Sequence, residues 1–78
     1  RRISIVAELP DVPGSLANMM SIVAKYGGNV LTINQDKLAS GKYIKQQTVE
    51  ATIETQGFEM VNKMKSAFIE AGIRVEFL

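Results

Sequence analysis

The chain has 78 residues, of which 46% are apolar, and it contains two prolines. This length and composition predict one globular domain and exclude a disordered polypeptide. The formal net charge is +1, and the basic residues are spread over both halves of the chain. The charge pattern therefore does not indicate nucleic acid or an anionic membrane as a partner.

The sequence contains no cysteine and no histidine. These absences exclude a disulfide, a thiolate nucleophile, a cysteine-ligated zinc site and a histidine base. No glycine-rich phosphate-binding motif is present, so we predict no cofactor and no metal. We expect neither a membrane span nor a signal peptide, and a chain without cysteine fits the reducing cytoplasm. Because Arg1 is not an initiator methionine, residues 1–78 are predicted to be a single domain cut from a longer protein.

The first part of the chain predicts a strand and then a helix. Side chains alternate in residues 1–9, which gives one apolar row: Ile3, Ile5, Ala7 and Leu9. Between residues 15 and 26, apolar side chains recur at helical spacing, at Leu16, Met19, Met20 and Val23. The "GGN" stretch at 27–29 tolerates a left-handed C-cap and ends this helix.

The second part predicts two antiparallel strands, a helix and a final strand. The strands are expected at 29–37 and 47–55, with a hairpin loop between them; the apolar row of the second is Val49, Ala51 and Ile53. The helix is expected to end at Gly72, and its apolar positions are Phe58, Val61, Met64 and Phe68. Residues 73–78 form the last strand, with one apolar row: Ile73, Val75 and Phe77.

The element order βαββαβ predicts a ferredoxin-like α+β sandwich. Right-handed crossovers place both helices on one face of a four-stranded antiparallel sheet with strand order 4-1-3-2. The second strand is then an apolar edge, and because natural proteins cover or pair such edges, a homodimer through it is predicted.

The fold hosts unrelated functions, so the residues have to decide. The third strand lacks the aromatic side chains of an RNA-recognition module, and no cysteine pair of a metallochaperone follows the first strand. The turn after the first strand has no arginine to hold an acyl phosphate for hydrolysis.

The stretch "LPDVPGSLANMMSIVAKYGGNVLTINQ" resembles the motif of the ACT domain family, small-molecule-sensing modules of amino-acid metabolism. In this family Asp or Asn, then x-Pro-Gly-x-Leu, opens the first helix, and Gly-x-Asn-Ile/Val begins the second strand. The matching residues are Asp11, Pro13, Gly14, Leu16, Gly28, Asn29 and Val30. "NVLTINQ" is also similar to small stand-alone ACT proteins associated with phenylalanine biosynthesis, but "KLASGKYIKQQ" departs from that subgroup, so its ligand is not carried over.

The resemblance implies a small amino acid as ligand, in a pocket formed at a dimer interface by this turn and the partner's second strand. Pro13 makes the turn rigid, and Gly14 lets a ligand approach the backbone. The amides of Gly14, Ser15 and Leu16 are expected to be free for a carboxylate, and Asp11 to accept hydrogen bonds from an ammonium group. The predicted ligand-binding residues are Asp11, Val12, Pro13, Gly14, Ser15, Leu16, Asn29 and Val30.

Plainer interpretations of these residues remain open at the level of sequence. Asp11 can be the N-cap of the helix, Gly14 a packing necessity, and Asn29 a left-handed residue after the helix. Ser15 has no histidine to activate it as a nucleophile. The methionines at helical spacing are interpreted as core residues: Met19, Met20, Met60 and Met64. In the hairpin loop, a tip or a lid over the pocket is predicted for Lys42, Tyr43 and Lys45.

We predict a non-catalytic regulatory domain that binds a small amino acid at a homodimer interface and transmits this allosterically to attached domains. The alternative is a structural dimerisation module of the same fold without a ligand. An enzyme that hydrolyses an acyl phosphate is disfavoured by the missing arginine.

Overall fold

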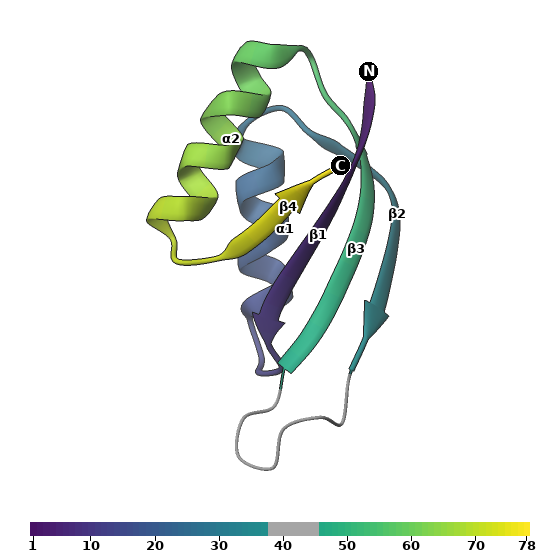
Figure 1. Cartoon of the computed structure of the whole chain (residues 1–78), viewed down its shortest axis with the longest axis vertical. Helices are drawn as coiled ribbons and strands as arrows, with labels where there is room; N and C mark the ends of the chain where they lie inside the picture. Colours follow the sequence, from purple (N-terminus) through teal and green to yellow (C-terminus); the bar gives the residue numbers. More distant parts are fainter. Residues whose placement is uncertain (38–45) are drawn as a thin grey trace.

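The computed structural model describes residues 1–37 and 46–78, and its elements follow the predicted order (Figure 1). They are β1 (Arg2–Pro10), α1 (Ser15–Lys25), β2 (Asn29–Asp36), β3 (Gln46–Glu54), α2 (Phe58–Glu70) and β4 (Arg74–Phe77). The sheet has the order β2-β3-β1-β4, every neighbouring pair is antiparallel, and both helices cover one face. The predicted α+β sandwich with strand order 4-1-3-2 is therefore confirmed. The loop predictions for Lys42, Tyr43 and Lys45 lie outside the described residues.

The core lies between the helices and the inner rows of β1 and β3. These two central strands pair in register along their length, from Arg2 opposite Glu54 to Pro10 opposite Gln46. The core side chains are Ile5, Ala7, Leu9, Met19, Val23, Val49, Ala51, Ile53, Met64 and Phe68, each at most 2% exposed. The apolar rows predicted for β1 and β3 are confirmed, because alternation places every second side chain on the same face.

Phe58 is an exception to the predicted apolar face of α2. Its side chain is 67% exposed, although it continues the helical spacing of Val61, Met64 and Phe68. Phe58 is the first residue of α2, and long side chains in a helix point back toward its N-terminus, past the end of the core. The guanidinium carbon of Arg1 lies 4.2 Å from the centre of its ring. A cation–π contact thus covers Phe58 instead of the core.

Helix α1 ends in a paired turn that leads directly into β2. The Gly27 amide donates to the Ala24 carbonyl at 3.1 Å, and the Gly28 amide donates to the Val23 carbonyl at 2.8 Å. These are the two bonds of a Schellman motif, and Gly27 takes the left-handed conformation with φ +79°. No other residue type has positive φ in the described ranges, and Asn29 begins β2. The interpretation of Asn29 as a left-handed residue is therefore wrong.

Strands β2 and β4 form the two edges of the sheet. The pairing of β2 with β3 shifts between Val30 and Thr32, so Leu31 is the extra residue of a bulge in β2. On β2, Leu31 is 37% exposed and Ile33 is 40% exposed. The described part of the chain contains the helices α1 and α2, and neither is long and apolar enough to cross a membrane.

Candidate functional site at the turn between β1 and α1

The predicted turn between β1 and α1 lies at one end of the sheet, together with one end of each of the strands β1, β2 and β3. Strands β1 and β2 run in the same direction, so their last residues lie beside the start of β3 and the N-terminus of α1 (Figure 1). A hollow of about 370 Å³ lies there. It is lined by Asp11, Val12, Pro13, Gly14, Leu16, Gln35, Lys37 and Gln47. Five of the predicted site residues are thus brought together with three that the sequence did not single out.

Gly14 is the N-cap of α1 and has a left-handed conformation, with φ +92°. A Cβ atom added to Gly14 would meet no atom of the described residues within 4 Å, so glycine is required for the backbone angle and the packing interpretation is wrong. The absence of a Cβ leaves this backbone open on the side of the hollow.

The amides at the start of α1 are only partly free. The Ser15 amide donates to the Val12 carbonyl at 3.3 Å, so the prediction that it is available to a ligand is wrong. The first helical bond runs from the Asn18 amide to the Gly14 carbonyl at 2.9 Å. The amides of Gly14, Leu16 and Ala17 have no backbone partner within the described ranges. Amides in this position carry partial positive charge and attract anions.

Asp11 faces a cation and does not cap the helix. Within the part of the chain that the structure describes, no side chain makes a capping hydrogen bond at the start of α1, so the capping interpretation is wrong. Instead, Oδ1 of Asp11 lies 3.2 Å from Nζ of Lys37, which follows the end of β2. The Asp11 side chain is 27% exposed and that of Lys37 is 61% exposed. The hollow therefore presents a half-buried carboxylate and a largely solvated ammonium group side by side.

Gln47 is a buried polar residue at the floor of the hollow, and it is 4% exposed. It stands in the same inner row of β3 as Val49, Ala51 and Ile53. Its Nε2 donates to the Pro10 carbonyl at 3.4 Å, whereas its Oε1 is buried and has no hydrogen-bond partner among the described residues. The alternation of β3 was the signal for this residue, because a polar residue continues an otherwise apolar row.

Three predicted residues do not line this hollow. Ser15 lies on the other side of the turn, on a smaller hollow of about 200 Å³ next to Ile73. Asn29 and Val30 begin β2, while the hollow lies at its end. At about 3.3 Å per strand residue, more than 20 Å separates them from Lys37 within one chain.

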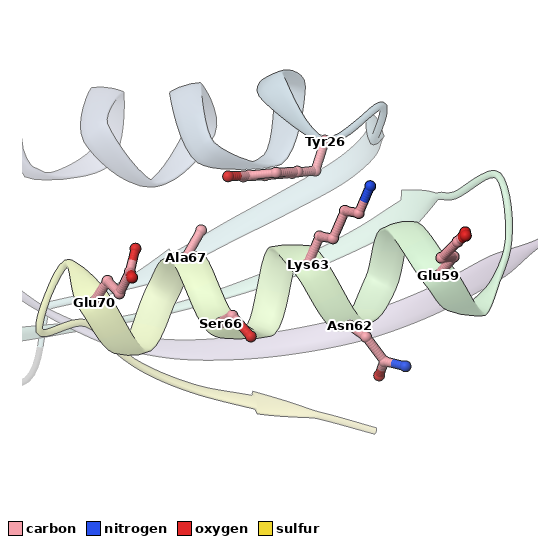
Figure 2. A pocket seen from close by; sticks show the side chains of 7 residues that line it. All are labelled: Tyr26, Glu59, Asn62, Lys63, Ser66, Ala67 and Glu70. Atoms are coloured by element: carbon pink, nitrogen blue, oxygen red, sulfur yellow. The ribbon is translucent and has the colours of Figure 1, made fainter.

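A second hollow, of about 410 Å³, lies along the outer side of α2. Figure 2 shows the ring of Tyr26 reaching from the end of α1 over α2, with Lys63 directed to the same side. Its charged side chains, Glu59, Lys63 and Glu70, are all exposed to solvent. Neither of the buried unpartnered side-chain oxygens found in residues 1–37 and 46–78 belongs to its lining, so the hollow at the turn is the stronger candidate for a binding site.

Comparison with known proteins places the fold. No protein-family model matches the chain. The chain is 30% identical over 78 residues to L-threonine ammonia-lyase of Geobacter sulfurreducens, and it covers 19% of the length of that protein. Among solved structures, prephenate dehydratase of Streptococcus mutans matches 99% of this chain with TM-score 0.79 and 23% identity. The chain spans 40% of that structure.

Two further solved structures that match this chain are an ACT domain and a regulatory subunit. The ACT domain of GTP pyrophosphokinase from Chlorobium tepidum matches 99% of this chain with TM-score 0.72 and 16% identity, and the chain covers 96% of it. The regulatory subunit of aspartate kinase from Thermus thermophilus matches 99% of the chain with TM-score 0.67 and 21% identity, over 48% of that subunit. With its element order, strand order and turn motif, the chain has the fold of the ACT domain family, as the motif predicted.

Proposed function

We propose that this chain is a non-catalytic regulatory domain of a longer cytoplasmic protein, and that it binds a small amino acid in the hollow at the turn. The observation that carries this proposal is the pairing of Asp11 and Lys37, 3.2 Å apart, on a hollow of about 370 Å³ beside the N-terminus of α1. A carboxylate and an ammonium group on one hollow match the two charges of an α-amino acid. The name of one structural neighbour, a regulatory subunit, supports the regulatory role.

The amino acid binds by exchanging ion-pair partners. Its ammonium group replaces Nζ of Lys37 at the Asp11 carboxylate, and its own carboxylate is bound by the released Lys37 and the amides of Gly14 and Leu16, which line the hollow. Opening the existing pair costs little, because ion pairs exposed to water contribute only about 0–1 kcal/mol. Every charge therefore keeps a partner during the exchange.

A catalytic role is not supported by the groups at the hollow. Histidine, the commonest base for proton transfer and for activating a nucleophile, is absent from the chain. The turn from Leu9 to Ser15 also has no arginine to stabilise a transferring phosphoryl group. The enzymes among the matched proteins are much longer than this chain, so their activities need not lie in the part that it matches.

The proposed site is completed by a second copy of the chain through β2. Twofold pairing of two β2 edges is antiparallel, so the first residues of one strand meet the last residues of its mate. Asn29 and Val30 of the second copy then approach the end of β2 next to Lys37. Within one chain these residues are too far from Lys37 to share the hollow with it. The exposed Leu31 and Ile33 support this pairing.

The dimer is tested by placing a charge on the β2 edge. Ile33→Lys is expected to convert the dimer to monomers, because a buried lysine at the centre of the paired edge would lack a counter-charge. The matched control is Ile69→Lys on α2, where the side chain is 77% exposed and distant from β2, and it is expected to stay dimeric. Sedimentation at tens of micromolar chain measures both. A monomeric wild-type chain would contradict the shared site.

The ligand is tested by thermal unfolding in the presence of each proteinogenic amino acid at millimolar concentration. A ligand that binds only the folded state adds about 2.7 kcal/mol to its stability at a concentration of about 100 Kd, so at least one amino acid is expected to raise the melting temperature clearly. If no amino acid shifts the melting temperature, the dimerisation module without a ligand is the better account.

A further inference from the structure

Gln47 is the most deeply buried polar group at the hollow, and half of its amide is unpaired. The residue is 4% exposed, and its Oε1 has no hydrogen-bond partner in the part of the chain that the structure describes. We infer that this oxygen accepts an N–H of the ligand's amino group, so that the site distinguishes α-amino acids from the α-keto acids of the same carbon skeleton. The inference rests on the proposed function and names the residue that makes this distinction.

The orientation of the Gln47 amide is set by the backbone of β1. Its Nε2 donates to the Pro10 carbonyl at 3.4 Å. The reversed amide would bring two acceptor oxygens together, so the carbonyl oxygen is the end of the amide that is left without a partner among the described residues. Pro10 directly precedes Asp11, and both Gln47 and Asp11 line the hollow. The Gln47 oxygen and the Asp11 carboxylate are both acceptors, and no donor is provided between them by the described residues other than Lys37.

Burying an acceptor without a donor destabilises a folded chain, so native proteins keep few such groups. The row that contains Gln47 is otherwise apolar, and an apolar side chain would fit its pattern. The unpaired oxygen has a clear use only when a donor arrives from outside. The second buried unpaired atom, Oγ1 of Thr55, lies just beyond the opposite end of β3, where the Thr55 amide donates to the Arg1 carbonyl at 2.7 Å.

An α-ammonium group fits the two acceptors. It has three N–H donors and no acceptor, so it can donate to Asp11 and to Oε1 of Gln47 at once. An α-keto acid has an oxygen at that position, so it would bring no donor hydrogen of its own to the two acceptors. Sites that are built to hydrogen-bond an N–H or O–H reject analogues without it strongly, because their buried polar groups are left unpaired.

The experiment measures binding of amino acids and of their keto acids by calorimetry, with L-alanine and pyruvate, L-phenylalanine and phenylpyruvate, L-aspartate and oxaloacetate, and the corresponding pair for any other amino acid that binds. The wild-type chain is expected to bind the amino acid at least about tenfold more tightly than its keto acid. Gln47→Met keeps the unbranched shape but removes the oxygen, and it is expected to weaken amino-acid binding about ten- to a hundredfold while keto-acid binding stays as it was.

One further variant tests whether any unpaired buried oxygen has the same effect. Thr55→Val removes the other unpaired buried oxygen, and it is expected to leave binding unchanged. If Gln47→Met discriminates as the wild type does, or if Thr55→Val loses the preference in the same way, the inference is overturned and the proposed function stands. Failure of the wild-type chain to bind any amino acid overturns both.

Discussion

Gly28→Ala is expected to lower the free energy of unfolding by about 1–3 kcal/mol, the usual cost of forcing an extra carbon into a filled core. A Cβ atom on Gly28 would lie 2.6 Å from Cγ1 of Val23 and 3.2 Å from Cε of Met64. Both neighbours are fully buried core side chains, so neither can move aside freely. In a domain of this size such a loss is a large share of the total stability.

The source of this cost is separable by a double-mutant cycle. Val23→Ala removes the atom closest to the added carbon, so the double variant is expected to be more stable than the sum of the two single costs predicts. Urea unfolding of the wild type, both single variants and the double variant gives the four free energies. Strictly additive costs would show that the added carbon does not meet Cγ1 of Val23.

Asp11→Ala is expected to weaken binding of the amino acid found in the thermal screen by about 2–4 kcal/mol, since it removes the half-buried carboxylate proposed to hold the ammonium group. The folded state should lose little, because the pair with Lys37 is partly exposed and such pairs contribute about 0–1 kcal/mol. Titration calorimetry gives the affinity, and thermal unfolding without ligand checks the fold.

The matched control for this variant is Glu70→Ala. Glu70 carries the same charge at the end of α2, and it is exposed and does not line the hollow at the turn. Its removal changes the net charge equally and is expected to leave the affinity within about a factor of two. Equal losses in both variants would indicate a general effect of charge and would contradict the role of Asp11.

Much of the fold was predictable because its signals are local. Alternation in β1 and β3 and helical spacing in α1 each require only neighbours along the chain, and the paired bonds of Gly27 and Gly28 follow from the residue types at the helix end. The strand order then follows from the handedness of two crossovers. The turn motif carried the family resemblance, and five of its predicted site residues line one hollow.

The contacts that the sequence did not predict depend on what lies beyond the ends of elements. Asp11 was expected either to cap α1 or to bind a ligand, whereas the ion pair with Lys37 requires the ends of β1 and β2 to meet. Phe58 fits the spacing of α2, but its place in the first turn carries it past the core. Periodicity assigns a face of an element and cannot locate where the opposite layer stops.

The unequal edges of the sheet limit how far it can be extended by further chains. In the proposed dimer each β2 is occupied by its mate, and β4 is the other edge of the described sheet, with four residues, Arg74–Phe77. Arg74 and Glu76 are exposed on it, and short, charged edges are poor templates for an incoming strand. Assembly is therefore expected to stop at the dimer, and a filament in which further chains extend the sheet edge to edge is disfavoured.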